Sequence, residues 1–570
     1  MTTIDEQLSD VDRPPLSNRL VWPLAGLGAL AVLISNVSGI AVGDDGVGYR
    51  ATADSLLDGH GLQYFLEHPL TVWPPLWPSL MALVAKITPL DTVGAAVLLN
   101  VVVTMVAVVA THRLLRRCLR DDRLVLAGTA VVALGGSTIG FGHLLMTDFA
   151  FSVVVVCFAL VLLQFRDRRR VGLLVAAAAL VWLGFFLRYA ALYLIPLGGL
   201  WLVLLNPTTN PADGTPDGTP DGTPERTPDG GPRTTEPQRQ TTQPAGWWAR
   251  STPAARISTA AIFGVIALIA PVAWMLRNRS LDGTFTGPRY PSERGIAGNA
   301  YDIAATLGKF LLPGVANGRD RIWALVGLVV VAAALVLGTR VLLATRRPGE
   351  STVRRTLRLL GGPTGLMIVL GGGYLAYMLY VRSTTALNRL DLRLLEPAYL
   401  PLMVCGLCLL DRVGALGVSW PTRAVLVARV WVGANIAAGL VAVVAFAAGN
   451  PYFDGNYDSD TFEQVRHNAA LAAIPDGCHV ISNLPNALYP VEQPEWSPRR
   501  TGLESDETVD DLDELLPTLA STPTCLVWVD EQPRYGHLWT LAELREHLTL
   551  EPLATDGDVA VYRVLPRTAS

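Results

Sequence analysis

Long apolar runs separated by short polar segments fill most of this chain of 570 residues. A membrane-spanning helix needs about 20 mainly apolar residues. The pattern therefore predicts eleven spans, near residues 20–42, 92–114, 123–141, 149–165, 171–187, 190–205, 257–276, 322–344, 363–381, 394–410 and 424–448. A further apolar stretch at 76–87 is shorter and lies between prolines. We expect it to be a helix in the membrane interface, with Trp73 and Trp77 at the level of the lipid headgroups.

Arginine is concentrated in three clusters, at 113–123, 166–170 and 340–358. With eleven spans, all three clusters fall on the same side of the membrane as the N-terminus. Cytoplasmic loops carry an excess of arginine and lysine, so this side is expected to be cytoplasmic. The first outer loop, 43–91, and everything after the last span are then expected outside a cell membrane that the chain crosses many times.

Three segments depart from the apolar pattern. Residues 1–19 are polar and predict a cytoplasmic tail before a retained anchor. Residues 206–245 consist largely of Thr, Pro, Asp and Gly, and predict a disordered cytoplasmic linker. Residues 449–570 alternate strand-like and helix-like runs, which favours a small α/β domain. The predicted fold is therefore an α-helical polytopic membrane protein, with a transmembrane domain at 20–448 and a small extracytoplasmic α/β domain at its C-terminus.

Composition supports this fold class. Apolar residues make up 51% of the chain and charged residues 16%, whereas soluble proteins have about 25% charged residues. We expect membrane lipids as partners and no nucleic acid. Cys478 and Cys525 each begin a strand-like run in the C-terminal part. If that part is extracytoplasmic, a disulfide between them is one of two open alternatives.

The first outer loop carries the strongest candidate chemistry. Two adjacent carboxylates, Asp44 and Asp45, follow the first span, and Tyr49 comes four residues after Asp45. The loop ends in a stiff run of aromatic residues and prolines that starts at Trp73. Carboxylates at membrane depth are costly, so they are functional hypotheses by default. The structural alternative is a polar helix end at the membrane interface.

Other outer loops add charged groups that suit a phosphate-linked substrate. Arginines grip phosphate through paired N–H donors, while a carboxylate can take a proton from an attacking hydroxyl. The candidates are His143, Asp148, Arg277, Arg389, Arg393 and Glu396. Several have plain alternatives: Asp148 can cap the helix that follows it, and Arg389 and Arg393 can be surface charges.

A metal site is a further alternative on the same face. Asp44, Asp148 and His143 are residue types that can hold a divalent cation. Their spacing across separate loops does not decide whether they meet, so no cofactor is assigned and a divalent metal stays open.

The first outer loop resembles that of the C-type (GT-C) glycosyltransferases, polytopic enzymes that use polyprenyl-phosphate sugars. The resembling branch holds the protein O-mannosyltransferases and the lipid A aminoarabinose transferases. The resemblance is carried by Asp45-x-x-x-Tyr49, Gly59-His60-Gly61, Pro74-Pro75 before an amphipathic helix, and the later run Arg393-x-x-Glu396-Pro397-x-x-x-Pro401. The resemblance spans roughly residues 20–410. Two positions depart from the pattern of the branch: Gly46 stands in the place of a Glu and Trp73 in the place of a Lys.

The resemblance implies a glycosyltransferase that moves a sugar from a polyprenyl-phosphate donor to an extracytoplasmic hydroxyl with inversion. Asp45 takes the place of the general base, and Asp44 is the alternative if the register is shifted. The expected substrate-binding residues are Tyr49, Asp148, Trp73, Arg277, Arg389, Arg393 and Glu396. The acceptor, whether glycan, protein or lipid, stays open.

Two other classes of function compete with this interpretation. One is a transporter or flippase of lipid-linked sugars, and the other is a non-catalytic assembly protein of the cell envelope. Transporters usually carry internal repeats and broken helices near the midplane. The sequence has no inverted repeat, and its ionisable residues lie on one predicted face, which favours an enzyme at the interface.

Overall fold

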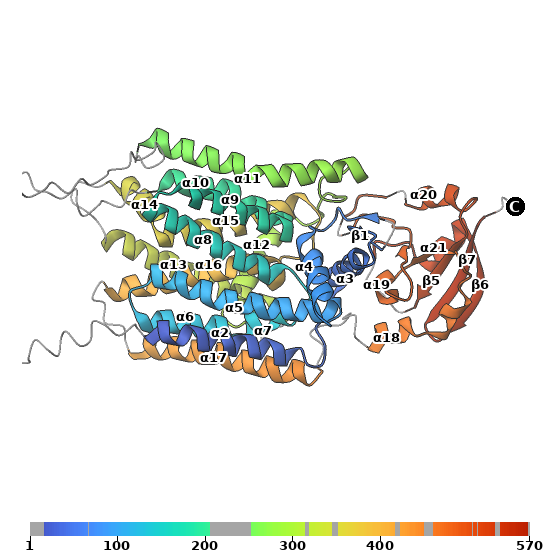
Figure 1. Ribbon diagram of the computed structural model, residues 1–570, viewed down its shortest axis with the longest axis horizontal. Helices are drawn as coiled ribbons and strands as arrows, with labels where there is room; N and C mark the ends of the chain where they lie inside the picture. The colour runs from blue at the N-terminus through green and yellow to red at the C-terminus, as the bar shows by residue number, and fades with distance from the viewer. Residues whose placement is uncertain are drawn as a thin grey trace, which may run out of the picture.

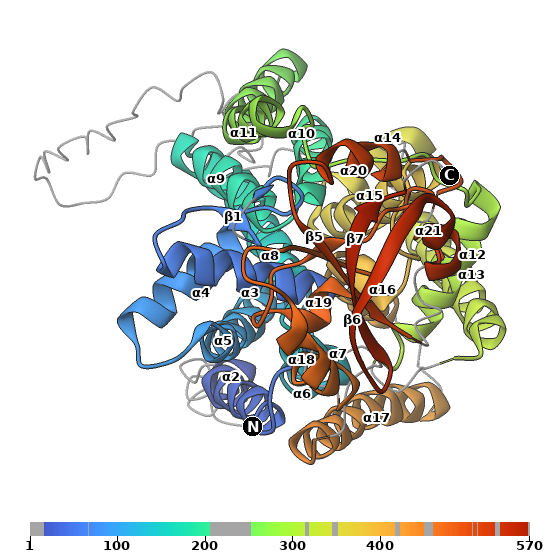
Figure 2. The same cartoon turned by 90° about the vertical axis from the view of Figure 1, so that its right-hand side faces the viewer.

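The computed structural model describes residues 16–65, 68–205, 252–313, 318–344, 351–415, 422–449, 460–503, 505–509, 511–530 and 536–567. The predicted linker at 206–245 and most of the predicted N-terminal tail lie outside these residues. A bundle of long helices extends along the molecule, and a small sheet domain lies at one end (Figure 1). Seen from that end, the domain covers the ends of the helices (Figure 2).

Each of the eleven predicted spans coincides with helical structure. Nine helices within the described residues are long and apolar enough to cross a membrane, and two further predicted spans are shorter apolar helices. The helices are α2 (Leu16–Ser35), α5 (Thr92–Cys118), α6 (Asp122–Leu134), α7 (Gly136–Gly142), α8 (Asp148–Arg168), α9 (Val171–Leu187), η1 (Tyr189–Tyr193), α10 (Leu194–Leu204), α11 (Pro253–Asp282), α13 (Asp320–Ala344), α15 (Pro363–Thr384), α16 (Leu392–Ala415) and α17 (Thr422–Ala447). The prediction of a polytopic helical membrane protein is confirmed.

The first span ends earlier than predicted. Helix α2 stops at Ser35 because the next residue, Asn36, turns its side chain onto the end of the helix. Its Nδ2 donates to the carbonyls of Val32, at 2.7 Å, and Gly142, at 3.1 Å. These bonds satisfy carbonyl groups that a helix end leaves open. The chain then runs in extended form toward the first outer loop.

The helices of the bundle differ in how much protein surrounds them. In α8, 83% of the apolar window is buried, whereas in α13 the figure is 11%. Since α8 is apolar all round, it fills the centre of the bundle. Its buried phenylalanines include Phe151, Phe158 and Phe165. A rigid central helix gives a fixed platform to the groups at its outer end.

The first outer loop forms two short helices, α3 (Asp44–Leu57) and α4 (Leu76–Ile87), with the two-residue strands β1 (Gln63–Tyr64) and β2 (His68–Pro69) between them. As predicted, α4 is a short apolar helix. The prediction for Trp77 was wrong: its side chain is only 1% exposed. Helix α4 packs against α3 and α5, so Trp77 fills the protein interior instead of reaching the headgroups.

Two further helices flank the bundle near the chain's middle. These are α12 (Ile296–Lys309), which packs against α13, and α14 (Thr352–Leu360), which packs against α15. Helix α12 carries Asp302, a member of the polar cluster described below.

The C-terminal part is an α/β domain, as predicted. Its sheet has the order β4-β3-β5-β7-β6, where β3 is parallel to β4 and β5, and β7 is antiparallel to β5 and β6. The strands are β3 (His479–Ser482), β4 (Glu495–Trp496), β5 (Thr524–Val529), β6 (Leu548–Asp556) and β7 (Val559–Pro566), and the helices are α18 (Asp460–Arg466), η4 (Ala469–Ala473), α19 (Pro485–Leu488), α20 (Asp511–Thr518) and α21 (Leu541–His547). Cys478 and Cys525 form a disulfide that joins the starts of β3 and β5.

The domain is fastened to the first outer loop by polar and aromatic contacts. The hydroxyl of Tyr489 donates to Asp54 Oδ2 at 2.5 Å, and its ring stacks on Phe65 with the centroids 5.5 Å apart. His68 Nε2 lies 2.6 Å from Glu495 Oε1. These contacts fix the domain above the outer ends of α3 and α8.

Candidate active site at the outer end of the bundle

A short backbone bridge brings the two acidic segments together. Ala41 N–H donates to the carbonyl of His143 at 2.8 Å, and Leu145 N–H donates to the carbonyl of Ala41 at 2.9 Å. The residues just before α3 are thereby tied to the residues just before α8. Both helices begin with acidic side chains, which suit the positive end of a helix dipole. Asp45 and Asp148 consequently lie near each other at the same end of the bundle.

Asp45 makes two charged or polar contacts and still reaches solvent. Arg393 NH1 lies 3.1 Å from Asp45 Oδ2, and Trp73 Nε1 donates to Oδ1 at 3.3 Å. The side chain of Asp45 is 31% exposed. Each carboxylate oxygen has further lone pairs, so Asp45 can accept a hydrogen bond from a ligand hydroxyl. Of the predicted residues, Asp45, Trp73 and Arg393 therefore meet.

Asp148 is completely buried and paired with an arginine that sequence reasoning did not select. Arg188 NH1 lies 2.6 Å from Asp148 Oδ1. Neither oxygen of Asp148 has a hydrogen-bond partner within the described residues. The alternative in which Asp148 caps α8 was wrong, since the cap position belongs to Thr147, which makes no side-chain capping bond. From the sequence alone, Arg188 is as consistent with an interfacial anchor as with a contact to a lipid headgroup, because its partner is distant in sequence.

Helix α16 carries a second acid one turn after Arg393. Glu396 is buried, and the Ser137 hydroxyl lies 3.2 and 3.1 Å from its two oxygens. Asp391 Oδ1 accepts from the backbone N–H of Leu394 at 3.1 Å, which caps the start of the helix. This cap fixes the first turn of α16 and with it the direction of Arg393.

Two glycines of α3 allow the close approach of its neighbours. A Cβ on Gly48 would lie 2.8 Å from the Trp73 ring, and a Cβ on Gly46 would lie 3.0 Å from the carbonyl of Leu145. Gly46 occupies the place where the resembling enzymes have a Glu. The close carbonyl explains in physical terms why a long side chain does not fit there without a shift of the backbone.

The aromatic residues of the first outer loop surround Asp45. The Trp73 ring makes edge contacts with Tyr49 and Tyr64, with centroids 6.1 and 5.0 Å apart. Burial, and then the charge of Asp45, raise the pKa of Tyr49. Its hydroxyl therefore stays protonated and lies 3.5 Å from Thr147 Oγ1. Burial and the charges of Asp44 and Asp45 likewise raise the pKa of Tyr64, which places Asp44 near that ring.

Arg277 does not join the Asp45 group. Its NH1 donates to the carbonyl of Leu70 and to Asn278 Oδ1, each at 2.9 Å, and its guanidinium lies 4.3 Å from the centre of the Trp274 ring. Tyr189 fastens the same stretch, because its hydroxyl donates to the carbonyl of Thr71 at 2.8 Å. Arg277 thus holds the first outer loop against α11.

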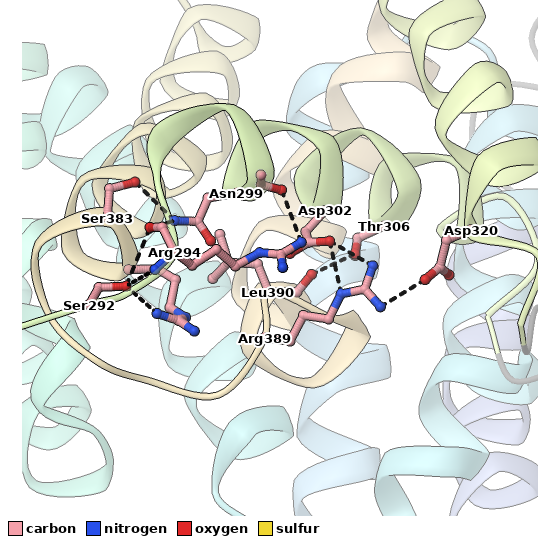
Figure 3. Close-up of polar contacts among 11 residues, drawn as sticks. Ser292, Arg294, Asn299, Asp302, Thr306, Asp320, Ser383, Arg389 and Leu390 are labelled. Carbon is pink, nitrogen blue, oxygen red and sulfur yellow. Dashed lines mark hydrogen bonds and ion pairs between the residues drawn. The ribbon is translucent and has the colours of Figure 1, made fainter. Parts of the chain in front are cut away.

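Arg389 also belongs to another cluster (Figure 3). Its Nε and NH2 donate to Asp302 Oδ1 at 2.8 and 2.6 Å, and its NH1 lies 2.8 Å from Asp320 Oδ2. Arg294 NH2 lies 2.8 Å from the other oxygen of Asp302, which is fully buried. The hydrogen bonds that Arg389 donates to Asp302 raise the pKa of Arg389. This cluster ties the segment before α16 to α12.

The residues of the metal alternative do not form a site. His143 is buried, and its ring stacks on Phe446 with the centroids 4.1 Å apart. Burial lowers its pKa to about 4. Across the described residues, no group of three or more His, Cys, Asp or Glu side chains is placed to hold a metal ion. The donor set of His143, Asp44 and Asp148 therefore does not fit a divalent cation.

Neither family models nor curated proteins match this sequence, but several solved structures are similar to it. ArnT from Cupriavidus metallidurans, bound to undecaprenyl phosphate, shares 13% identity at a TM-score of 0.43, over 95% of this chain and 97% of that one. The Archaeoglobus fulgidus oligosaccharyltransferase in complex with Zn and sulfate shares 10% identity at a TM-score of 0.49, over 95% and 72%. The arabinofuranosyltransferase AftD from Mycobacteria shares 12% identity at a TM-score of 0.46, over 97% of this chain and 40% of that one. This likeness is one of chain path and leaves the chemistry to this protein's own side chains.

Proposed function

We propose that the protein is a membrane glycosyltransferase that moves a sugar from a polyprenyl-phosphate donor to an extracytoplasmic acceptor hydroxyl, with inversion. The placement of Asp45 carries this proposal: it is a partly exposed carboxylate, held between Arg393 and Trp73, where the outer loop meets the bundle. The resemblance of the first outer loop to the GT-C enzymes supports the same role for Asp45.

The outer face of the bundle is proposed to be extracytoplasmic. The disulfide between Cys478 and Cys525 supports this, because disulfides persist in oxidising compartments. The arginine clusters of the opposite face support it as well. In this orientation the N-terminus is cytoplasmic, and the domain at 449–570 covers the site from outside.

Two arginines are proposed to receive the donor phosphate. Arg393 and Arg188 each contact a carboxylate through NH1. A guanidinium has five N–H donors in a fixed fork, so it can hold a carboxylate and a phosphate at once. Asp148 fixes Arg188 from below, within the bundle. A lipid-linked phosphate is proposed to contact both guanidinium groups.

The proposed step is a displacement at the sugar's anomeric carbon. Asp45 takes the proton of the acceptor hydroxyl while the hydroxyl oxygen forms a bond to that carbon. The bond between the anomeric carbon and the phosphate oxygen breaks, and its electron pair leaves with the lipid phosphate. The negative charge that this oxygen gains lies beside Arg393 and Arg188, which lowers the barrier. Attack opposite the leaving phosphate inverts the configuration.

A transfer assay on two neighbouring carboxylates tests this proposal. Transfer from radiolabelled polyprenyl-phosphate sugars is measured in membranes for the wild type, Asp45→Asn and Asp44→Asn at matched protein levels. General base catalysis contributes about 10²–10⁴-fold, so Asp45→Asn is expected to lose activity on that scale. Asp44→Asn, one residue away in the same helical turn, is expected to stay within about tenfold of the wild type.

The reverse pattern would move the base to Asp44. Equal activity of all three proteins would refute a base in this loop. If the wild type transfers no sugar from any donor, the transporter interpretation replaces the enzyme.

A further inference from the structure

A cavity of about 690 Å³ lies between the first outer loop and the C-terminal domain. The loop contributes its wall from Tyr64 to Trp73, and the domain contributes residues of β3, β4 and α20. The cavity is therefore built by the two parts of the chain together. A space of this size falls in the range of ligand-binding pockets, roughly 300–1,000 Å³.

Aromatic rings line the cavity from both sides. Tyr64 and Trp73 come from the loop, and Trp496 comes from β4. All three side chains are partly buried, so each holds a fixed position and still has surface available to a ligand. Flat rings offer an apolar face to the C–H face of a sugar ring, while the hydroxyls at the sugar's edge need polar partners.

The charged groups of the cavity are mostly acidic. Four carboxylates line it, those of Asp282, Glu495, Asp511 and Glu514, together with the guanidinium of Arg499 and the imidazoles of His68 and His479, which contact Glu495. Arg499 is already paired, since its Nε and NH2 donate to Asp511 at 2.6 and 3.1 Å. Carboxylates accept hydrogen bonds from hydroxyls, and their combined charge disfavours an anionic ligand.

Trp73 connects this cavity to the candidate base. Its indole lines the cavity, and its Nε1 donates to Asp45 Oδ1 at 3.3 Å. Arg393 contacts the other oxygen of Asp45 at 3.1 Å. Asp45 thus separates an acidic, aromatic space beneath the domain from the arginines at the end of the bundle. An anionic donor would bind on the arginine side of Asp45, and an uncharged acceptor would bind on the side of the cavity.

We infer that the cavity is an acceptor subsite for an uncharged saccharide, which stacks on Trp496 and presents a hydroxyl past Trp73 to Asp45. This inference rests on the proposed function, because it identifies which class of acceptor that function uses. A polypeptide acceptor is the competing class. It would need partners for its backbone C=O groups as well as its N–H groups, and the four carboxylates of the cavity accept hydrogen bonds but cannot donate one to a C=O group.

Binding without donor tests the inference apart from catalysis. The full-length protein in lipid nanodiscs is titrated with mannotriose, maltotriose and arabinofuranotriose, with trigalacturonate as an acidic probe and with a decapeptide of Ser, Thr, Ala and Gly. Saturation-transfer NMR reports each contact. We expect a neutral trisaccharide to bind and the acidic trisaccharide and the peptide to bind at least about tenfold more weakly.

Two pairs of variants locate the binding. Trp496→Ala should weaken saccharide binding roughly tenfold or more, the usual scale for removal of a buried tryptophan contact. Trp22→Ala, which removes an exposed tryptophan of α2, should leave it unchanged. Glu514→Arg should improve binding of trigalacturonate relative to the neutral sugars. Asp513→Arg introduces the same charge at an exposed neighbour that does not line the cavity, and it should not.

Tighter binding of the peptide than of every saccharide would overturn the inference. So would saccharide binding that survives Trp496→Ala together with trigalacturonate binding that Glu514→Arg does not improve. Since Glu514 is exposed on α20, its variant tests the cavity even if Trp496→Ala fails to fold. A protein that binds the saccharide but transfers no sugar would refute the proposed function and leave this subsite in place.

Discussion

Two groups, each made of a buried carboxylate and its arginine partners, lie on the outer side of the bundle. Their carboxylates differ in what they contact. In the first group, Asp148 makes one ion pair with Arg188, and neither of its oxygens accepts a hydrogen bond within the described residues. In the second group, Asp302 accepts two hydrogen bonds from Arg389 and pairs with Arg294 (Figure 3). Oδ2 of Asp302 also accepts no hydrogen bond within the described residues, but Oδ1 accepts two, whereas Asp148 accepts none on either oxygen. Buried polar groups are normally hydrogen-bonded, so we take the less satisfied carboxylate, Asp148, as the better candidate for a functional group.

The same contrast separates their arginines. Arg389 uses its Nε, NH1 and NH2 on two protein carboxylates, which leaves little of its fork for a ligand. Arg393 contacts Asp45 through NH1 alone. We therefore expect the second group to support the fold and the first to support catalysis. Matched substitutions in the two groups test whether their roles differ in this way.

The largest expected effect comes from the buried acids. Asp148→Asn leaves Arg188 without a counter-charge, and breaking a buried ion pair costs about 3–5 kcal/mol. Asp302→Asn should cost less, about 1–3 kcal/mol, because Arg389 keeps Asp320 as a partner and Arg294 and Arg389 are 37% and 49% exposed. Thermal unfolding in detergent measures both.

A double variant then separates folding from function in the first group. Asp148→Asn with Arg188→Gln removes both charges and should recover most of the lost stability while transfer stays low. Recovery of transfer together with stability would show that the first group is structural, and the contrast between the two groups would fail.

The next largest effect is expected at the arginines. Arg393→Lys keeps the charge but loses the planar fork, so it should lower kcat/KM about 10²-fold, the scale for loss of one preorganised donor to a developing anion. Arg389→Lys should stay within about tenfold of the wild type, since it acts by holding the segment before α16. Transfer kinetics with both lysine variants measure the difference. Equal losses would place both arginines in one functional unit.

Sequence reasoning predicted the spans well because the length of an apolar run is a local property of the chain. It also selected Asp45, Tyr49, Trp73 and Arg393, since their order along the chain resembles a known pattern. These side chains do lie together.

The structure separates arginines that the sequence could not distinguish, because an arginine's partner is set by tertiary packing. In the sequence, Arg277 and Arg389 each lie in a predicted outer loop, as Arg393 does. In the structure, Arg277 binds the carbonyl of Leu70, and Arg389 binds Asp302. Arg188 was missed because Asp148, its partner, lies on the preceding helix of the pair α8 and α9. The sequence does place Arg188 on the side opposite the arginine clusters, which is unusual for an arginine. It does not indicate which residue Arg188 contacts.

The cavity itself was beyond prediction from the sequence. Its walls come from residues near position 64 and residues near position 496, which only the docking of the domain brings together. The sequence predicted a small α/β domain after the last span. It did not indicate that Trp73 would line the cavity and contact Asp45 at once.

The smallest effect concerns a third carboxylate, whose partners are histidines. Glu495 lies 2.6 Å from His68 Nε2 and 3.5 Å from His479 Nε2, and so joins the first outer loop to the sheet. Hydrogen bonds from His479 and His68 lower its pKa below the ordinary value of 4.5. A depressed carboxyl pKa stabilises the fold at every pH above the unfolded value, and this contribution is lost only as the pH falls below it.

Glu495→Gln should therefore lower stability by less than about 1 kcal/mol at pH 7 and still at pH 5, since the group is 39% exposed and solvent screens the pair. Glu492→Gln is the matched control, because burial raises the pKa of Glu492. Its charged form opposes folding at neutral pH, so this substitution should be neutral or slightly stabilising. Unfolding midpoints of both variants at the two pH values measure the effect. A loss for Glu495→Gln as large as that for Asp148→Asn would mean that the histidine contact, and not the aromatic contact of Tyr489, holds the domain over the site.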